Sequence, residues 1–80
     1  MVTVEVALYA TIRVYHPQGE SAEPFKMQLS PGSTVDYLLE ELKIPPEEGR
    51  TVLIDGHYRG GEYILQEGDK VSIFPAIVGG

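Results

Sequence analysis

The chain has 80 residues, no cysteine and a formal net charge of −6. A chain of this length forms one small domain with a single modest core. The lack of cysteine excludes disulfides, zinc–thiolate sites and thiol nucleophiles. The negative charge argues against nucleic-acid binding, which requires clustered Lys and Arg. It is equally typical of a merely soluble surface and of a protein steered onto a basic partner.

The sequence also lacks signals for membrane insertion or export. No apolar run approaches the ~20 residues of a membrane span. The first ten residues, MVTVEVALYA, have neither a basic leader nor a cleavage site. We therefore expect a cytoplasmic protein that does not associate with membranes.

The N-terminal third predicts an antiparallel pair of strands. Residues 2–8 alternate with a period of two, which predicts a half-buried strand whose apolar side is formed by Val2, Val4, Val6 and Leu8. Residues 15–24 hold two prolines and a glycine and predict a loop. Residues 25–29, FKMQL, alternate again, so the two strands are expected to form a hairpin.

A short helix is expected next. Ser33 or Thr34 is a favourable N-cap, and apolar residues then follow the i, i+3, i+4, i+7 spacing of one helical face at Val35, Leu38, Leu39 and Leu42. Pro45 and Pro46 prevent the helix from continuing. A helix this short is marginal alone, so it must pack its leucines on the sheet.

The C-terminal third predicts three more extended segments. Residues 51–55, TVLID, form a third strand, and Asp55-Gly56 is a tight-turn signal after which residues 57–59 return as a short strand. A turn at residues 67–69 leads into the final strand. There Val71 and Ile73 share one face, and Ser72 and Phe74 share the other. Phe74 would lie outside the main core if Val71 and Ile73 face that core.

This order predicts an α+β fold: a mixed sheet of four to five strands with one main helix on one face. That is the β-grasp, or ubiquitin-like, arrangement. We expect residues 1–80 to form a single β-grasp domain, with a globular core over 1–74 and a flexible C-terminal Gly-Gly tail over 75–80. Pro75 cannot donate to a strand ladder and helps to end the pairing.

Side-chain catalysis and metal binding have little support in the sequence. His16 and His57 fall in predicted turns, are expected to be exposed, and lack partners at metal-ligand spacing. The five tyrosines are scattered along the chain. The carboxylates are explained by a solvated helix end and by turns, at Glu40, Glu41, Glu47 and Glu48 and at Asp55, Glu67 and Asp69.

The remaining chemical group is the carboxylate of Gly80. Gly79 and Gly80 lack side chains and permit many backbone conformations, so they can pass through a channel too narrow for a Cβ atom. Such a segment can bring its carboxylate to the α-phosphate of ATP in another protein. Ala76, Ile77 and Val78 are small or aliphatic and could line that channel.

Three segments together resemble one family. LYATIR at 8–13, GSTVDYLLEEL at 32–42 and above all LQEGDKVSIFPAIVGG at 65–80 are similar to the ubiquitin-like sulfur carriers. These are the small subunits of molybdopterin synthase (MoaD) and their relatives in thiamine biosynthesis (ThiS). The resemblance covers nearly the whole chain, although Ala76 stands where the molybdopterin branch usually has a second proline.

The resemblance implies a carrier or small subunit of a sulfur-transfer enzyme rather than a stand-alone catalyst. A ubiquitin-activating-enzyme-like adenylyltransferase would adenylate the Gly80 carboxylate, and a sulfur donor would then convert it to a thiocarboxylate. In the molybdopterin branch, the tail enters the synthase large subunit and delivers sulfur to precursor Z. ATP and sulfur act at the partner, so this chain is expected to bind no cofactor or metal. Phe74, Pro75, Ala76, Ile77 and Val78 would contact the partner.

Several alternatives stay open at this point. The tail is also compatible with sulfur carriers for thiamine thiazole synthesis, where thiazole synthase is the partner, or for cysteine synthesis. A ubiquitin-like modifier would instead conjugate Gly80 to lysines of target proteins, and a plain β-grasp binding module would not need the glycines. Phe74 is either an aromatic anchor for a partner or a core residue.

Overall fold

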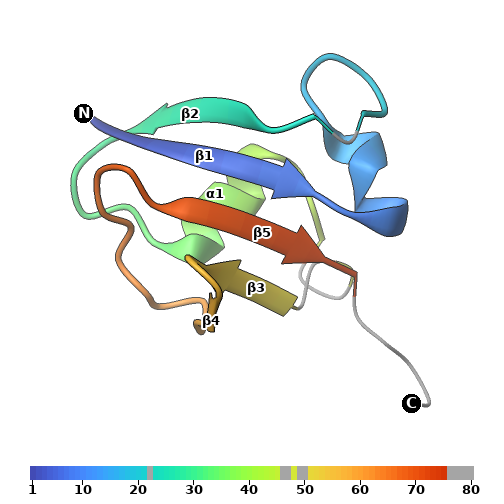
Figure 1. Cartoon of the computed structure of the whole chain (residues 1–80). Coiled ribbons are helices and arrows are strands. Elements are labelled where there is room, and N and C mark those ends of the chain that lie inside the picture. Colours follow the sequence, from blue (N-terminus) through green and yellow to red (C-terminus); the bar gives the residue numbers. More distant parts are fainter. Residues whose placement is uncertain (22, 46–47, 49–50, 76–80) are drawn as a thin grey trace.

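A computed structural model describes residues 1–21, 23–45, 48 and 51–75. Its sheet is built around β1 (Val2–Leu8), which has a neighbour on each side (Figure 1). The antiparallel neighbour is β2 (Phe25–Leu29), and the parallel neighbour is β5 (Lys70–Phe74). The structure thus confirms the predicted hairpin and the mixed sheet.

The other half of the sheet is a small hairpin beside β5. β3 (Thr51–Ile54) pairs antiparallel with β5 and also with β4 (His57–Tyr58), which gives the strand order β2-β1-β5-β3-β4. Asp55 and Gly56 join β3 to β4 with φ angles of 51° and 85°. Two successive residues with positive φ are typical of the type I′ turn, whose twist suits a tight hairpin.

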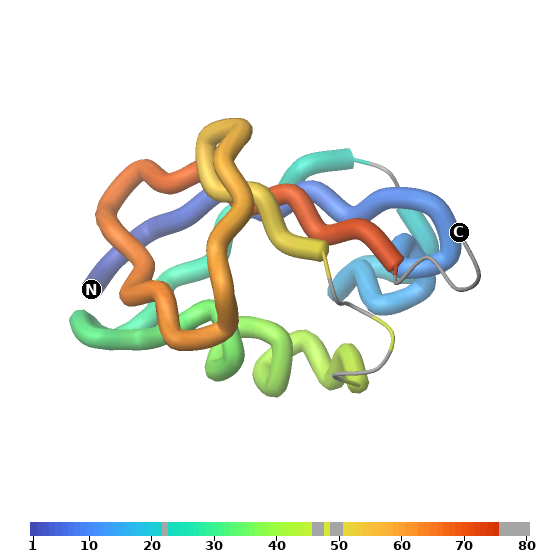
Figure 2. The backbone as a smooth tube through the Cα atoms, turned by 90° about the horizontal axis from the view of Figure 1, so that it is seen from below, coloured from blue at the N-terminus to red at the C-terminus, as the bar shows by residue number. Residues whose placement is uncertain are grey.

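One helix, α1 (Val35–Glu41), lies across one side of the sheet (Figure 2). Its N-cap is Thr34, whose Oγ1 accepts a hydrogen bond from the backbone N–H of Tyr37 at 3.2 Å. The helix ends through Lys43, which has a φ of 62° and lets the N–H of Ile44 bond to the carbonyl of Leu39. This left-handed ending occurs before the two prolines that the sequence offers as a stop.

The core lies between α1 and the sheet. The apolar sides of β1, β3 and β5 face the helix, together with residues from the connecting segments. Among the described residues, fifteen buried side chains form one cluster: Val4, Val6, Leu8, Ile12, Leu29, Val35, Leu38, Leu39, Leu42, Ile44, Val52, Ile54, Leu65, Val71 and Ile73. Because side chains alternate along a strand, the intervening residues point to the opposite side of the sheet. That side, which α1 does not cover, is called the open face below.

A 3₁₀ helix, η1 (Ala10–Tyr15), follows β1 and was not predicted. His16 comes directly after it, and its predicted exposure is wrong: the side chain is only 7% exposed. Its Nδ1 accepts a hydrogen bond from the N–H of Gln18, its Nε2 lies 3.0 Å from the carbonyl oxygen of Glu23, and the ring packs edge-on against Phe25. His16 therefore organises the loop internally, whereas His57 is exposed as expected.

Among the described residues, no helix has the length and apolar character that crossing a membrane requires.

Candidate functional site: an aromatic patch at the end of β5

The open face is ordered into rows by the strand register. Ala7 lies beside Ser72, which lies beside Leu53, and Leu53 pairs with Tyr58. The next row towards the end of β5 pairs Phe74 with Thr51. The C-terminal half of β5 therefore presents mostly uncharged side chains on the side that the helix leaves uncovered.

Phe74 is held by a second aromatic ring. The rings of Tyr9 and Phe74 stack almost in parallel, with centroids 4.4 Å apart and planes inclined by 7°. The position of Tyr9 is fixed by its backbone N–H, which donates to the carbonyl of Ile73 at 3.1 Å. Tyr9 is still 42% exposed, so the stacked pair forms part of the surface.

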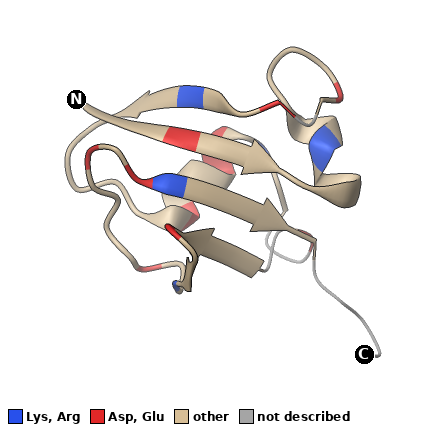
Figure 3. Cartoon of the chain, viewed as in Figure 1, with Lys and Arg blue, Asp and Glu red and all other residues tan. Residues whose placement is uncertain are grey.

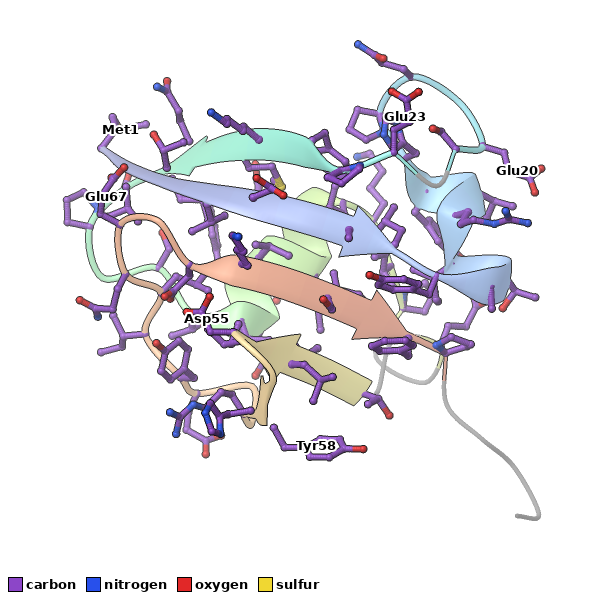
Figure 4. All side chains as sticks on the ribbon, in the orientation of Figure 1. Met1, Glu20, Glu23, Asp55, Tyr58 and Glu67 are labelled. Carbon is purple, nitrogen blue, oxygen red and sulfur yellow. The ribbon has the colours of Figure 1, made fainter. Side chains whose placement is uncertain are left out.

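A shallow hollow with mainly apolar walls lies beside this pair, bordered by Thr51, Leu53, Tyr58, Phe74 and Pro75. Tyr58 is 76% exposed and projects beyond the β3–β4 hairpin at the edge of the sheet (Figure 4). We call Tyr9, Leu53, Tyr58, Phe74 and Pro75 the aromatic patch. Tyr9 and Tyr58 are exposed, and Leu53, Phe74 and Pro75 are half-buried. Contiguous apolar side chains at a surface mark interaction sites, and clustered aromatic residues supply most of the binding free energy in many interfaces.

The structure places some of the predicted site residues and leaves others outside its description. Phe74 is half-buried, lies on the open face and does not belong to the core cluster, and Pro75 follows it directly. The predicted site residues Ala76, Ile77, Val78, Gly79 and Gly80 lie outside the described residues.

Sequence reasoning missed three members of the patch. Tyr9, Leu53 and Tyr58 come from separate segments, and two of the tyrosines that are scattered along the sequence lie beside Phe74 in the fold. The position of Leu53 on the open face could have been predicted from the sequence, since side chains alternate along a strand and Leu53 lies between Val52 and Ile54. The sequence gives no indication that Tyr9 contacts Phe74, because this contact depends on the parallel pairing of β1 with β5.

One carboxylate is buried, which the sequence did not indicate. Asp69 is only 7% exposed, and its Oδ2 accepts hydrogen bonds from the N–H of Gln66 at 2.8 Å and the hydroxyl of Tyr63 at 3.2 Å. Burial raises the pKa of the Tyr63 hydroxyl, and the charge of Asp69 raises it further. Since these bonds close the turn before β5, Asp69 has the turn role predicted for it, inside the protein rather than at its surface.

The other predicted acidic residues behave as surface groups where the structure describes them. Glu40, Glu41 and Glu48 are exposed, and Glu47 lies outside the described residues. Glu48 also accepts a hydrogen bond of 2.6 Å from the hydroxyl of Tyr15. Within the described ranges no group of three metal-ligating side chains comes together.

The mixed five-stranded sheet with one helix defines a ubiquitin-like protein of the β-grasp fold. The family model described as Mut7-C ubiquitin matches residues 1–78, and the chain belongs to this family. The match stops before Gly79 and Gly80. A comparison with curated proteins finds no match.

Solved structures give the same fold. A Pyrococcus furiosus protein described as a molybdopterin converting factor, subunit 1, is 25% identical, with a TM-score of 0.73 over 96% of this chain and 100% of its own. Small archaeal modifier protein 1 of Haloferax volcanii is 19% identical, with a TM-score of 0.70 over 96% of this chain and 100% of its own. The HVO 2177 protein of the same organism is 22% identical, with a TM-score of 0.74 over 99% of this chain and 87% of its own.

Proposed function

We propose that this chain is a sulfur carrier that docks through the aromatic patch and is activated at the carboxylate of Gly80. An adenylyltransferase related to ubiquitin-activating enzymes would join this carboxylate to the α-phosphate of ATP and release pyrophosphate. Sulfide released by a sulfur donor would then attack the acyl carbon, displace AMP and leave a thiocarboxylate. ATP and the donor act at the partner, and this chain supplies the docking surface and the reacting carboxylate.

The observation that carries the proposal is the position of the aromatic patch. Tyr9, which is exposed, and the half-buried Phe74 and Pro75 form an apolar surface at the end of β5, immediately before residues 76–80 in the chain. A partner that covers this surface is well placed to receive the segment that follows. Residues that bury an aromatic side chain in a partner are typical anchors, and anchoring next to the reacting group reduces the entropy lost in positioning it.

The proposed pathway is molybdenum cofactor biosynthesis, with a molybdopterin synthase large subunit as the second partner. Support comes from the Pyrococcus furiosus protein, which is described as a molybdopterin converting factor subunit and resembles this chain over its full length. Thiazole synthase or a cysteine-forming enzyme would take the place of the large subunit if the carrier serves another pathway.

The test is mass spectrometry of the full chain purified without a C-terminal tag and incubated with the adenylating enzyme, ATP and a sulfur donor. The C-terminal fragment is expected to gain the mass difference between sulfur and oxygen. The fragment must be isolated, because oxidation of either of the two methionines changes the mass almost equally. A fragment that stays an unmodified carboxylate under these conditions overturns the carrier proposal.

The variant Gly80→Val tests the role of the terminal residue. We expect it to keep the free energy of unfolding of the wild type, because residue 80 follows all five strands, and to lose thiocarboxylate formation, because a branched side chain would block a channel built for glycine. Tyr37→Ala, an exposed change on the helix, is the control and should be activated normally. Normal activation of Gly80→Val would contradict the proposed role of Gly80 as the residue that enters the active site of the adenylating enzyme.

Conjugation to other proteins is the second candidate function. The fold likeness to small archaeal modifier protein 1 favours it, since that protein is described as a modifier. A modifier would use the same activated Gly80 but would form amide bonds with lysines of targets. Adducts joined to lysine in extracts of the native host would support conjugation, and a thiocarboxylate without such adducts would support the carrier role.

A further inference from the structure

The open face changes from apolar to charged along its strands. Glu5 on β1 lies beside Lys26 on β2 and also beside Lys70 on β5, so the three form one cross-strand row with charges in the order plus, minus, plus. Figure 3 shows this alternation across the three strands. We call Lys26, Glu5 and Lys70 the charged row.

The formal charge of the charged row has the opposite sign to the net charge of the whole chain. Two lysines and one glutamate give the row a formal charge of +1, with Glu67 and Asp55 as acidic neighbours, whereas the chain carries −6. The row also contains two of the three lysines in the sequence. The acidity of the whole chain suggested a basic partner surface, but the two lysines of the charged row are suited to carboxylate side chains of a partner.

The two lysine ammonium groups are available for a partner. In the part of the chain that the structure describes, the only ion pair joins Arg13 and Glu20, at 3.6 Å, and Lys26 and Lys70 are both exposed. Asp55 bonds to the backbone N–H of Lys70 at 3.4 Å rather than to its ammonium group. These side chains are therefore solvated and can form ion pairs without first breaking internal ones.

The surface between these lysines is hollowed. Lys26, Lys70, Glu5 and Gly68 line this hollow, and Glu67 reaches it while its Oε1 accepts a hydrogen bond from the N–H of Thr3. A hollow between two lysines can admit a side chain from a partner. Glu67 keeps its negative charge while it accepts this bond, so Glu5 and Glu67 are the two carboxylates that such a side chain would meet between the lysines.

The spacing links the charged row to the aromatic patch. Lys70 and Phe74 lie on the same face of β5, four residues apart, which corresponds to ~13 Å along a strand. A standard interface covers about 800 Å² on each partner, which is wide enough to span both features. A partner seated on Phe74 is therefore large enough to reach the charged row as well.

We propose that the charged row is the second half of the docking surface, and that the partner is a protein with carboxylate side chains opposite Lys26 and Lys70. This inference rests on the proposed function of the aromatic patch as a docking site. The patch supplies binding free energy, while the row sets the orientation of the partner and accelerates its association. A partner rotated on the patch would leave these lysines unpaired or place them against its own cations.

A charge-swapped variant tests the row without disturbing the sheet. E5K/K26E/K70E reverses every charge but keeps opposite charges on neighbouring strands, so it places no like charges side by side in the sheet. The control is K43E, at the end of α1 on the other side of the sheet. Each lysine-to-glutamate change contributes −2 and E5K contributes +2, so both variants have a net charge of −8 instead of −6.

Surface plasmon resonance at low and high salt would measure how each variant associates with the adenylating enzyme of the same organism. We expect the swapped variant to bind about tenfold more weakly, mainly through a slower association rate, and the loss to shrink at high salt. K43E should bind within about twofold of the wild type, because it lies away from the interface. The neutral variant K26Q/K70Q should show a smaller loss than the swap.

The outcomes separate the inference from the proposed function. Equal or tighter binding by a folded E5K/K26E/K70E variant, with thermal unfolding like that of the wild type, would overturn the charged row as a docking element. Equal weakening by K43E would also overturn it, since net charge alone would then explain the effect. If wild-type protein does not bind the enzyme or acquire sulfur, the proposed function fails and the inference falls with it.

Discussion

Adjacent residues on the two faces of β5 have different roles, one in the core and one at the surface. Ile73 is fully buried against the core, while Phe74 stacks on Tyr9 at the surface of the open face. The backbone between them is a regular strand, so only the alternation of side chains separates the two environments. The comparison indicates that changes on the helix side should affect stability, and changes on the open face should affect binding.

The largest expected effect on stability belongs to the helix side. Ile73→Ala would remove buried methyl and methylene groups from the centre of the core cluster and leave a cavity, at a cost of about 2–5 kcal/mol in the free energy of unfolding. A small domain has only a few kcal/mol to lose. Urea denaturation would measure the change, and a loss smaller than that of a surface substitution would contradict the assignment of this face.

The neighbouring residue should show the reverse pattern. Phe74→Ala would lose its stacking on Tyr9, worth about 1 kcal/mol of stability. Its binding to the adenylating enzyme should fall by roughly 30-fold, which is the level expected when an anchor residue is truncated. Tyr37→Ala removes an exposed aromatic ring from the helix and serves as the matched control. If both variants bound equally well, the aromatic patch would not be the docking site.

A smaller effect is expected at the edge of the open face. Tyr58 is paired with Leu53 but remains largely exposed, so Tyr58→Ala should change the free energy of unfolding by less than about 1 kcal/mol. Its binding should weaken by roughly fivefold, as for a residue at the border of an interface rather than its centre. Tyr58→Phe keeps the ring and should bind like the wild type, and calorimetric titration of the three proteins would show whether the ring is the contact.

Much of this fold could be predicted because the sequence pattern and the local chemistry agree. The alternation of residues 25–29 gave the bounds of β2, and Thr34 was one of two predicted N-caps for α1. The turn between β3 and β4 could be predicted because Asp55 and Gly56 are residue types that tolerate positive φ. These features depend on neighbours in the chain, so a single sequence contains most of the information required.

The features that were missed depend on contacts between distant segments. His16 is buried because the carbonyl of Glu23 and the ring of Phe25 come together around it, and a polar residue in a loop gives no sign of that. Tyr9 joins the aromatic patch only because β1 and β5 pair in parallel. The predicted site residues Phe74 and Pro75 followed from strand periodicity and family resemblance, whereas their neighbours on the surface required the sheet register.

The smallest expected effect is a pH-dependent change in stability at Tyr63, which packs against the core cluster. Tyr63 donates to Asp69, and burial, followed by the charge of Asp69, raises the pKa of its hydroxyl above the ordinary value of about 10. The folded protein therefore holds this proton more tightly than the unfolded chain. The stability that this proton contributes is fully present below about pH 10 and is lost as pH rises through the folded-state pKa.

Tyr63→Phe should separate this contribution from general alkaline effects. At neutral pH the variant should be less stable by about 1 kcal/mol, because Asp69 loses one of its two hydrogen bonds. As the pH increases above about 10, the wild type loses stability through this proton and the variant does not, so the difference between them should shrink. Urea denaturation at a series of alkaline pH values would measure it, with Tyr58→Phe as a control that keeps the wild-type slope. If the difference in the free energy of unfolding between the two proteins stayed constant with pH, burial and Asp69 would not raise the pKa of the Tyr63 hydroxyl.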